Sequence, residues 1–246
     1  MKRFIFQVRN GLHIIDLAKT LHQVKHCIGI MADTIAQHKT IMFVGTKKQA
    51  KSVIKECAEA CGEFYVCERW LGGMLTNLST IRQSIRKLER TEKRLETGGD
   101  GLTKKELSNL SKEQIKLARN LDGIRSMRKP PGLVVVVDPN QEHLAVAEAN
   151  KLNIPVMALV DTNCDPDPIE YVIACNDDAL KSIRTILQAL AHAAINKKRE
   201  MHMALAKEKS ADDQEDSAEL VAEEKTRKEK RARILAAKLG SGEEES

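Results

Sequence analysis

The chain has 246 residues, of which 42% are hydrophobic and 3% aromatic, with 40 Lys and Arg against 35 Asp and Glu. This length gives one large or two small domains with a core, and the net charge of +5 keeps nucleic acid open as a partner. The low aromatic content argues against modules that stack RNA bases on several rings. The six cysteines form no C-x-x-C pair, so neither a zinc ribbon nor a thioredoxin-like site is indicated. No apolar run is long enough to span a membrane.

The first part of the chain is predicted to alternate helices and short strands. Apolar residues recur at helical spacing from residue 16 to 37, beginning with Leu17 and Leu21. Residues 40–44 then form an apolar strand, residues 49–60 return to helical spacing, and residues 64–67 form a second strand.

A third strand is indicated at residues 133–137, which are all Leu or Val and therefore buried on both faces of a parallel sheet. Asp138-Pro139 supplies a cap and a first-turn proline for a helix over residues 141–152. Strands over 155–160 and 171–174 follow, and a last core helix begins near residue 177. The sequence therefore predicts an α/β fold, a flavodoxin-like parallel sheet with right-handed crossovers.

An insertion between the second and third strands shows a different pattern. Apolar residues step by three and four on both sides of Gly98-Gly99-Asp100-Gly101, which predicts an antiparallel α-helical coiled-coil hairpin. Glu92 and Gln114 fall on its apolar seam, so its distal half should be the looser. Thr103 and Glu106 form a capping-box pattern for the return helix, which is expected to break near Ser111 because the pattern repeats there.

Three parts are therefore expected. Residues 1–70 and 131–200 form a discontinuous α/β body, and residues 71–130 form the coiled-coil hairpin. The charged C-terminal tail, residues 201–246, has no aromatic residue and too little apolar content for a core, which predicts disorder or a helix.

Basic residues mark possible contacts with RNA phosphates in three places. Lys47 and Lys48 follow a strand and precede a helix, where backbone amides can hold phosphate, although an ordinary turn would look the same and no Walker loop is present. The stretch 69–77 has a glycine pair that permits close backbone approach or positive φ, and Trp70 is expected to be its structural anchor. A basic edge on the first hairpin helix is either a phosphate-facing surface or a solvated flank. The candidate RNA-binding residues are Lys47, Lys48, Arg69, Gly72, Gly73, Asn77, Arg82, Arg86, Arg90 and Arg94.

Acidic residues cluster where two strands end. Asp161, Asp165, Asp177 and Asp178 could bind a divalent cation at the carboxyl edge of the sheet, or act only as helix caps and Asx turns. A small metal-dependent α/β enzyme is thus an alternative function, and a coiled-coil adaptor that binds only protein is a third. No serine, cysteine or histidine has a context that suggests a nucleophile and its base, so we expect neither catalysis nor a cofactor.

Several segments closely resemble the bacterial family of small-subunit ribosomal protein two. These are Phe43-Val44-Gly45-Thr46-Lys47, Arg69 to Gly73 with Leu75-Thr76-Asn77 and Thr80 to Ser84, Asp138 to Pro155 with Glu142-His143 inside it, and Val160 to Asp167. The resemblance runs in order from about residue 1 to residue 194. It implies a structural constituent of the small ribosomal subunit, located on the ribosome in the cytoplasm, that binds small-subunit ribosomal RNA and neighbouring ribosomal proteins and helps dock ribosomal protein one.

The resemblance also has limits. Family members usually carry an N-terminal segment with a Gly-x-His-Phe-Gly-His pattern, and this chain begins where they are already under way, so we expect that segment to be missing. Some members use acidic residues matching Asp161, Asp177 and Asp178 together with an N-terminal histidine as a metal pocket. Without that histidine, zinc is not expected here.

Overall fold

Five parallel strands form the central sheet of the computed structural model, which describes residues 1–97 and 103–206. They are β3 (Ile41–Val44), β4 (Phe64–Val66), β5 (Leu133–Val137), β6 (Val156–Val160) and β7 (Tyr171–Ala174). Their order in the sheet is β4-β3-β5-β6-β7, so the third strand of the sheet in chain order pairs with the first, as in flavodoxin-like folds. The predicted α/β fold is confirmed.

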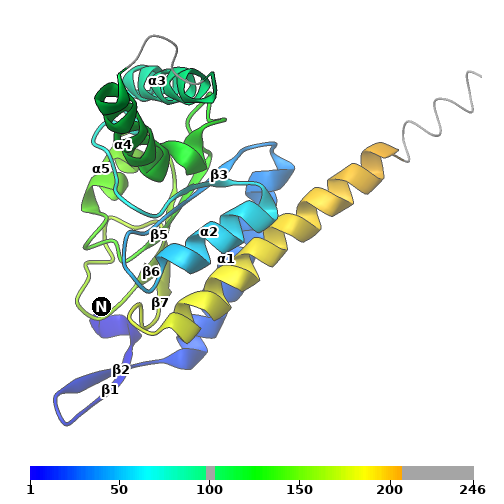
Figure 1. Ribbon diagram of the computed structural model, residues 1–246. Coiled ribbons are helices and arrows are strands. Elements are labelled where there is room, and N and C mark those ends of the chain that lie inside the picture. The colour runs from blue at the N-terminus through cyan, green and yellow to red at the C-terminus, as the bar shows by residue number, and fades with distance from the viewer. Residues whose placement is uncertain (98–102, 207–246) are drawn as a thin grey trace, which may run out of the picture. The chain divides into compact units, whose positions relative to one another are not determined.

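Helices cover both faces of this sheet, as Figure 1 shows. One face is covered by α1 (Leu17–Ala36), α2 (Lys51–Cys61) and a helix over residues 180–198. The other face packs against α5 (His143–Lys151) and the inserted helices α3 (Leu78–Glu96) and α4 (Lys104–Leu121). Every residue of β3, β5 and β6 is buried, as expected for apolar strands covered on both faces.

The inserted helices share the core of the body. Ile81, Ile85 and Leu88 of α3 lie in the same buried cluster as strand residues such as Met42 and Val134. A short 3-10 turn, η2 (Asp122–Ile124), follows α4 and packs against β4. The base of the insertion is therefore fixed to the sheet by apolar packing.

Of the two predictions for the second helix of the insertion, one is confirmed and one is wrong. The capping box is confirmed, because Glu106 N donates to Thr103 Oγ1 and Thr103 N donates to Glu106 Oε2 (2.8 Å). The break near Ser111 is wrong, since α4 runs without interruption through that position and its packing on α3 overrides a local cap signal. The two polar seam residues satisfy each other, with Gln114 Nε2 donating to Glu92 Oε1 (3.3 Å). The turn expected at 98–101 lies outside the described residues, and the coiled coil stays a prediction.

A β-hairpin precedes α1 and was not predicted. Strands β1 (Ile5–Arg9) and β2 (Leu12–Ile15) pair antiparallel and follow a short 3-10 turn, η1 (Lys2–Phe4). Asn10 and Gly11 both have positive φ, as a tight hairpin turn requires. Leu17 and Leu21, which begin the apolar stripe predicted for α1, are 76% and 56% exposed. Only the later turns of α1, from Cys27 onward, bury apolar side chains in the core.

Residues 1–198 form one compact unit, and residues 199–246 form a second. Within the second unit, residues 199–206 are described and helical; the rest of the expected charged tail lies outside the described residues. No helix in the described ranges is long and apolar enough to cross a membrane.

Candidate nucleic-acid interface

Glu148, on α5, organises the loop between β4 and α3. Its Oε1 accepts hydrogen bonds from Trp70 Nε1 (3.1 Å) and Gly73 N (2.7 Å). Its Oε2 accepts from Leu75 N (3.0 Å) and from both the amide and the hydroxyl of Thr76 (3.1 Å each). One carboxylate therefore satisfies five donors of the loop, and Trp70 is buried beside it, which fits its expected role as the structural anchor.

The ionised form of Glu148 is favoured by these donors. Burial by itself would raise the pKa of Glu148, but the hydrogen bonds from Thr76, Leu75, Trp70 and Gly73 outweigh it and lower the pKa. Glu148 was missed as a functional residue because it lies more than 70 residues from the loop in the chain, and nothing in its local sequence indicates that distant contact.

The two adjacent glycines of this loop differ in what they tolerate. Gly73 has φ +85°, and a Cβ there would lie 3.0 Å from Asn77 Cβ, whereas a Cβ on Gly72 would meet nothing within 4 Å. We expect Gly73→Ala to lower the free energy of unfolding by about 1–2 kcal/mol, because a side chain is strained at positive φ. Gly72→Ala should change it by less than about 0.5 kcal/mol. Urea unfolding of both variants checks this, and equal losses would contradict it.

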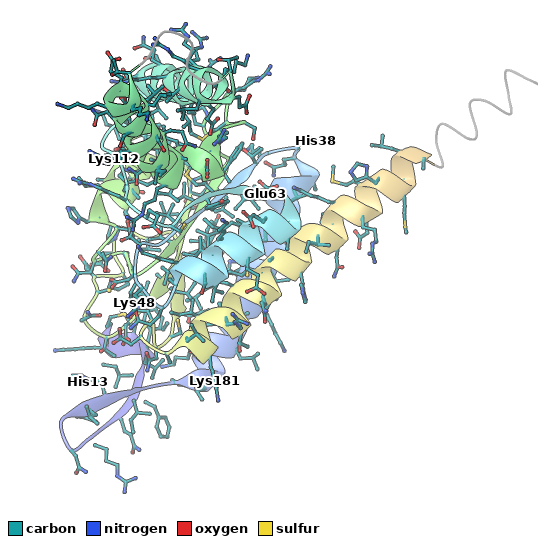
Figure 2. The ribbon with its side chains drawn as sticks, in the orientation of Figure 1. His13, His38, Lys48, Glu63, Lys112 and Lys181 are labelled. Atoms are coloured by element: carbon teal, nitrogen blue, oxygen red, sulfur yellow. The ribbon has the colours of Figure 1, made fainter. Side chains whose placement is uncertain are left out.

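The turn after β3 is filled by protein groups. Glu142 Oε1 accepts from Thr46 N (2.7 Å) and Thr46 Oγ1 (2.6 Å), and Glu142 is 2% exposed. The Glu142 carboxylate thus already accepts the hydrogen bond of the Thr46 amide, which a phosphate at this turn would need. Of the two lysines, Lys48, which is labelled in Figure 2, is exposed and has no hydrogen-bond or ion-pair partner among the described residues.

Lys47 instead lies among carboxylates at the carboxyl edge of the sheet. Its Nζ is 2.5 Å from Asp177 Oδ1, 2.6 Å from Asp178 Oδ1 and 3.4 Å from Asp138 Oδ2. Its own burial lowers its pKa, but the hydrogen bonds to Asp177 and Asp178 outweigh that effect and raise the pKa. Lys47 is therefore an internal counter-charge, and its ammonium group is already engaged.

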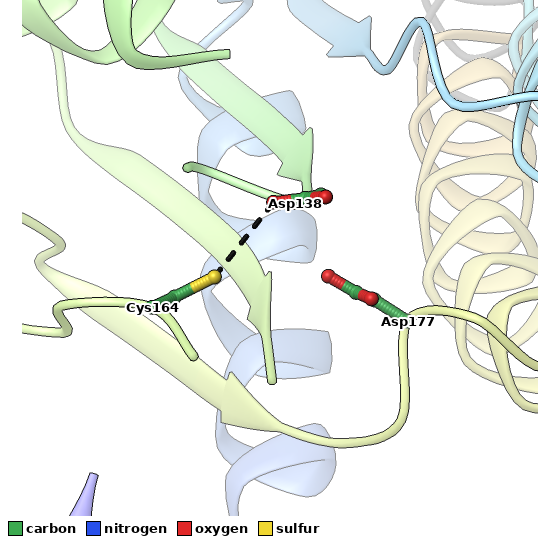
Figure 3. Close-up of side chains that lie close together, drawn as sticks. All are labelled: Asp138, Cys164 and Asp177. Atoms are coloured by element: carbon green, nitrogen blue, oxygen red, sulfur yellow. Dashed lines mark hydrogen bonds between the residues drawn. The ribbon is translucent and has the colours of Figure 1, made fainter. Parts of the chain in front are cut away.

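Three of the four acidic residues predicted at this edge come together, and Asp165 does not join them. Ligand atoms of Asp161, Asp177 and Asp178 lie within 4.8 Å of one another, and so do those of Asp138, Cys164 and Asp177, which Figure 3 shows. Cys164 Sγ donates to Asp138 Oδ1 (3.7 Å). Burial raises the pKa of Asp177 to about 6, against the opposing effect of Lys47. Lys47 supplies positive charge to both groups, and Asp165 belongs to neither.

Cationic side chains form a stripe along α3. Arg82, Arg86, Arg90 and Arg94 follow one another at intervals of four residues, so they share one side of the helix, and all four are exposed. None of them has a hydrogen-bond or ion-pair partner among the described residues. The nearby Lys87, by contrast, pairs with Glu113 of α4. Arg69, in the loop before α3, is likewise exposed and unpaired within the described ranges.

The remaining members of the predicted set shape the loop. Asn77 Oδ1 accepts from the hydroxyls of Ser79 and Thr80 (3.0 Å each), so it holds the first turn of α3. Gly73 provides positive φ, and Gly72 is exposed. A further cation, Arg128, faces the arginine stripe across a groove and was missed, although it stands in a short basic run, Arg125 to Lys129, that could have indicated it.

The chain matches a known family over most of its length. The family model described as Ribosomal protein S2 matches residues 1–197. The small ribosomal subunit protein uS2 of Protochlamydia amoebophila is 70% identical over 216 residues, which cover 88% of this chain and 79% of that protein. The uS2 protein of Chlamydia trachomatis serovar D is 59% identical over 82% of this chain and 71% of its own length. The uS2 protein of Chlamydia caviae is 52% identical over 99% and 88%.

These matches decide between the alternatives that the residues left open. The family is structural and not enzymatic, so the alternative of a metal-dependent enzyme at the Asp cluster is not supported. With a family match across residues 1–197 and relatives of up to 70% identity, the chain belongs to the ribosomal protein S2 family.

Proposed function

We propose that this protein, as a structural constituent of the small ribosomal subunit, holds ribosomal RNA by phosphate contacts along α3 and the loop before it. The proposed phosphate contacts are Arg69, Arg82, Arg86, Arg90 and Arg94, with Lys48 at the turn after β3. Gly72 leaves the backbone open to close approach, while Gly73, Asn77 and Trp70 hold the loop in shape. Lys47 is not retained among these contacts because three carboxylates engage it.

The observation that carries this proposal is the unpaired arginine stripe. Like charges four residues apart on a helix repel each other and destabilise it by roughly 0.2–0.5 kcal/mol per pair. Elsewhere the described part of the chain neutralises its partly buried cations with its own carboxylates, as at Lys47 and Lys51. A row of unneutralised guanidinium groups on a rigid helix fits a polyanion, and guanidinium groups suit phosphate oxygens in particular.

We further propose that the β1–β2 hairpin and the start of α1 form the docking surface for ribosomal protein one. Phe6 is 69% exposed, Leu12 72% and Leu17 76%, and Val8 and Leu21 are also exposed. A groove of about 880 Å³ adjoins them, lined by residues of β2, the start of α1 and the start of the helix over residues 180–198. An exposed apolar patch of this kind is typical of a protein–protein contact.

Sedimentation tests the proposed function. A tagged copy of the full chain, expressed in cells and fractionated on a sucrose gradient, is expected to travel with small ribosomal subunits. Raising KCl from 50 to 200 mM at fixed magnesium should weaken rebinding to depleted subunits on the order of 10³-fold, because six phosphate contacts release counterions. The phosphate-contact proposal is overturned if the tagged chain from growing cells stays at the top of the gradient. It is also overturned if the affinity does not change with salt.

A further inference from the structure

The groove between α3 and the segment after η2 is lined by two arginines of the α3 stripe and two from the opposite segment. It has a volume of about 490 Å³ and is lined by Arg82, Ile85, Arg86, Glu89, Arg125, Ser126, Met127 and Arg128. Arg82 and Arg86 come from α3, and Arg128 comes from the segment that leads into β5. Four guanidinium groups thus line a hollow whose volume lies at the lower end of the range for small-ligand sites.

Only three of these four arginines are free to bind a ligand. Arg125 donates from Nη1 to Glu92 Oε2 (2.7 Å), from Nη2 to Glu92 Oε1 (2.6 Å), and from Nε to Asp122 Oδ1 (2.8 Å). It is therefore neutralised by protein carboxylates. Arg82, Arg86 and Arg128 have no hydrogen-bond or ion-pair partner among the described residues, and Glu89 is the only carboxylate in the lining. With Arg125 and its two carboxylate partners included, four positive charges stand against three negative ones, so the groove keeps a net charge of +1.

The walls of the groove are held in place before any ligand arrives. The two-point contact of Arg125 with Glu92 ties the segment after η2 to α3. Ile85 and Met127, which also line the groove, are 4% and 1% exposed, so they belong to the core. Met127 N also donates to Ile124 O (3.0 Å). A site with fixed walls loses less conformational entropy when it binds a ligand.

We propose that this groove clasps one backbone phosphate of ribosomal RNA, with Arg82 and Arg86 on one wall and Arg128 on the other. The inference rests on the proposed function and names a site within it. The planar fork of a guanidinium group matches the oxygens of a phosphodiester, and Ser126 adds a hydroxyl donor. Arg90 and Arg94 lie beyond the groove and would contact other phosphates. Arg128 is thus assigned a role in RNA binding, and Arg125 the role of positioning residue.

A matched pair of variants tests the site. Arg128→Gln and Lys129→Gln each remove one exposed positive charge from neighbouring residues, but only Arg128 lines the groove. Affinity is measured for small subunits depleted of this protein, with the full chain, at several KCl concentrations. Arg128→Gln should weaken binding about 10-fold and reduce the slope of log K against log salt by about 0.7–0.9. Lys129→Gln should weaken it less than 2-fold.

A double substitution asks whether both walls hold the same phosphate. If they do, Arg82→Gln together with Arg128→Gln should cost clearly less than the product of the two single effects, because either single change already frees that phosphate. Circular dichroism and thermal melting should match the unmodified chain, since both arginines are exposed.

The outcomes separate the site from the proposed function. If the unmodified chain does not bind the depleted subunits, the proposed function fails. If it binds and Arg128→Gln binds equally well, or if Arg128→Gln and Lys129→Gln lose the same amount, the groove is not a phosphate site and the proposed function stands. If the double variant loses affinity by the product of the two single losses, the two walls do not hold the same phosphate.

Discussion

Glu148→Gln is expected to lower the free energy of unfolding at pH 7 by about 3 kcal/mol, because hydrogen bonds to a charged acceptor contribute most when buried and directional. The carboxylate accepts five hydrogen bonds from the loop. A glutamine keeps one acceptor oxygen, and its amide group would point two donors at the donors of the loop. Urea unfolding measures the loss.

The effect of this substitution should depend on pH. The folded pKa of Glu148 is lowered, so its contribution is fully present above the pKa of the unfolded chain and is lost as the pH falls through the folded pKa. The difference between Glu148→Gln and the unmodified chain should therefore shrink in acid. Glu96→Gln, at the exposed end of α3, is the control and should change stability by less than about 0.5 kcal/mol. A Glu148→Gln variant as stable as the control would show that the loop holds its shape without the carboxylate.

Gly123→Ala should be comparably damaging, with an expected loss of about 3 kcal/mol. Gly123 lies in η2, and a Cβ there would stand 2.1 Å from Tyr65 O and 2.7 Å from the Tyr65 ring. The nearest obstacle is backbone oxygen of β4, so η2 and the sheet edge would have to move apart. Because η2 leads into the segment that carries Arg128, the affinity for depleted subunits should fall as well.

The control for this substitution is Gly29→Ala. Gly29 is exposed on α1, and a Cβ there would meet nothing within 4 Å. Alanine is the better helix former, so this variant should gain roughly 0.5–1 kcal/mol. Thermal melting of both variants gives the comparison. If Gly123→Ala melts at the temperature of the unmodified chain, the close approach of η2 to β4 is not required for the fold.

The sheet could be predicted from the sequence because its strands are signalled locally. A short continuous apolar run such as residues 133–137 forms few structures other than a strand that is buried on both faces. The β1–β2 hairpin was missed although its sequence carries a signal. Apolar residues alternate with polar ones on both sides of the Asn10-Gly11 turn, a pattern typical of a hairpin, but the apolar side chains are exposed and no core contact marks them.

The site could be predicted only as far as charge spacing reveals it. Arginines at intervals of four on a helix share a side wherever the helix packs, so the stripe on α3 was predictable. The sequence could not predict which cations lack an ion-pair partner, because those partners are brought close only by folding. Lys47 meets Asp177 across 130 residues, and Arg125 meets Glu92 across 33. The same holds for Glu148, whose partners lie 72 to 78 residues away.

The arginine stripe on α3 also affects the protein before it is assembled into a ribosomal subunit. Within the described residues Arg82, Arg86, Arg90 and Arg94 have no hydrogen-bond or ion-pair partner, and the nearby Glu89 and Glu106 offset only part of their charge, so the newly made protein presents a cationic surface. Such a surface attracts any polyanion at long range. Surplus copies would therefore gather on messenger and transfer RNA, and it follows that the cell gains by keeping the supply of this protein matched to the supply of its own RNA.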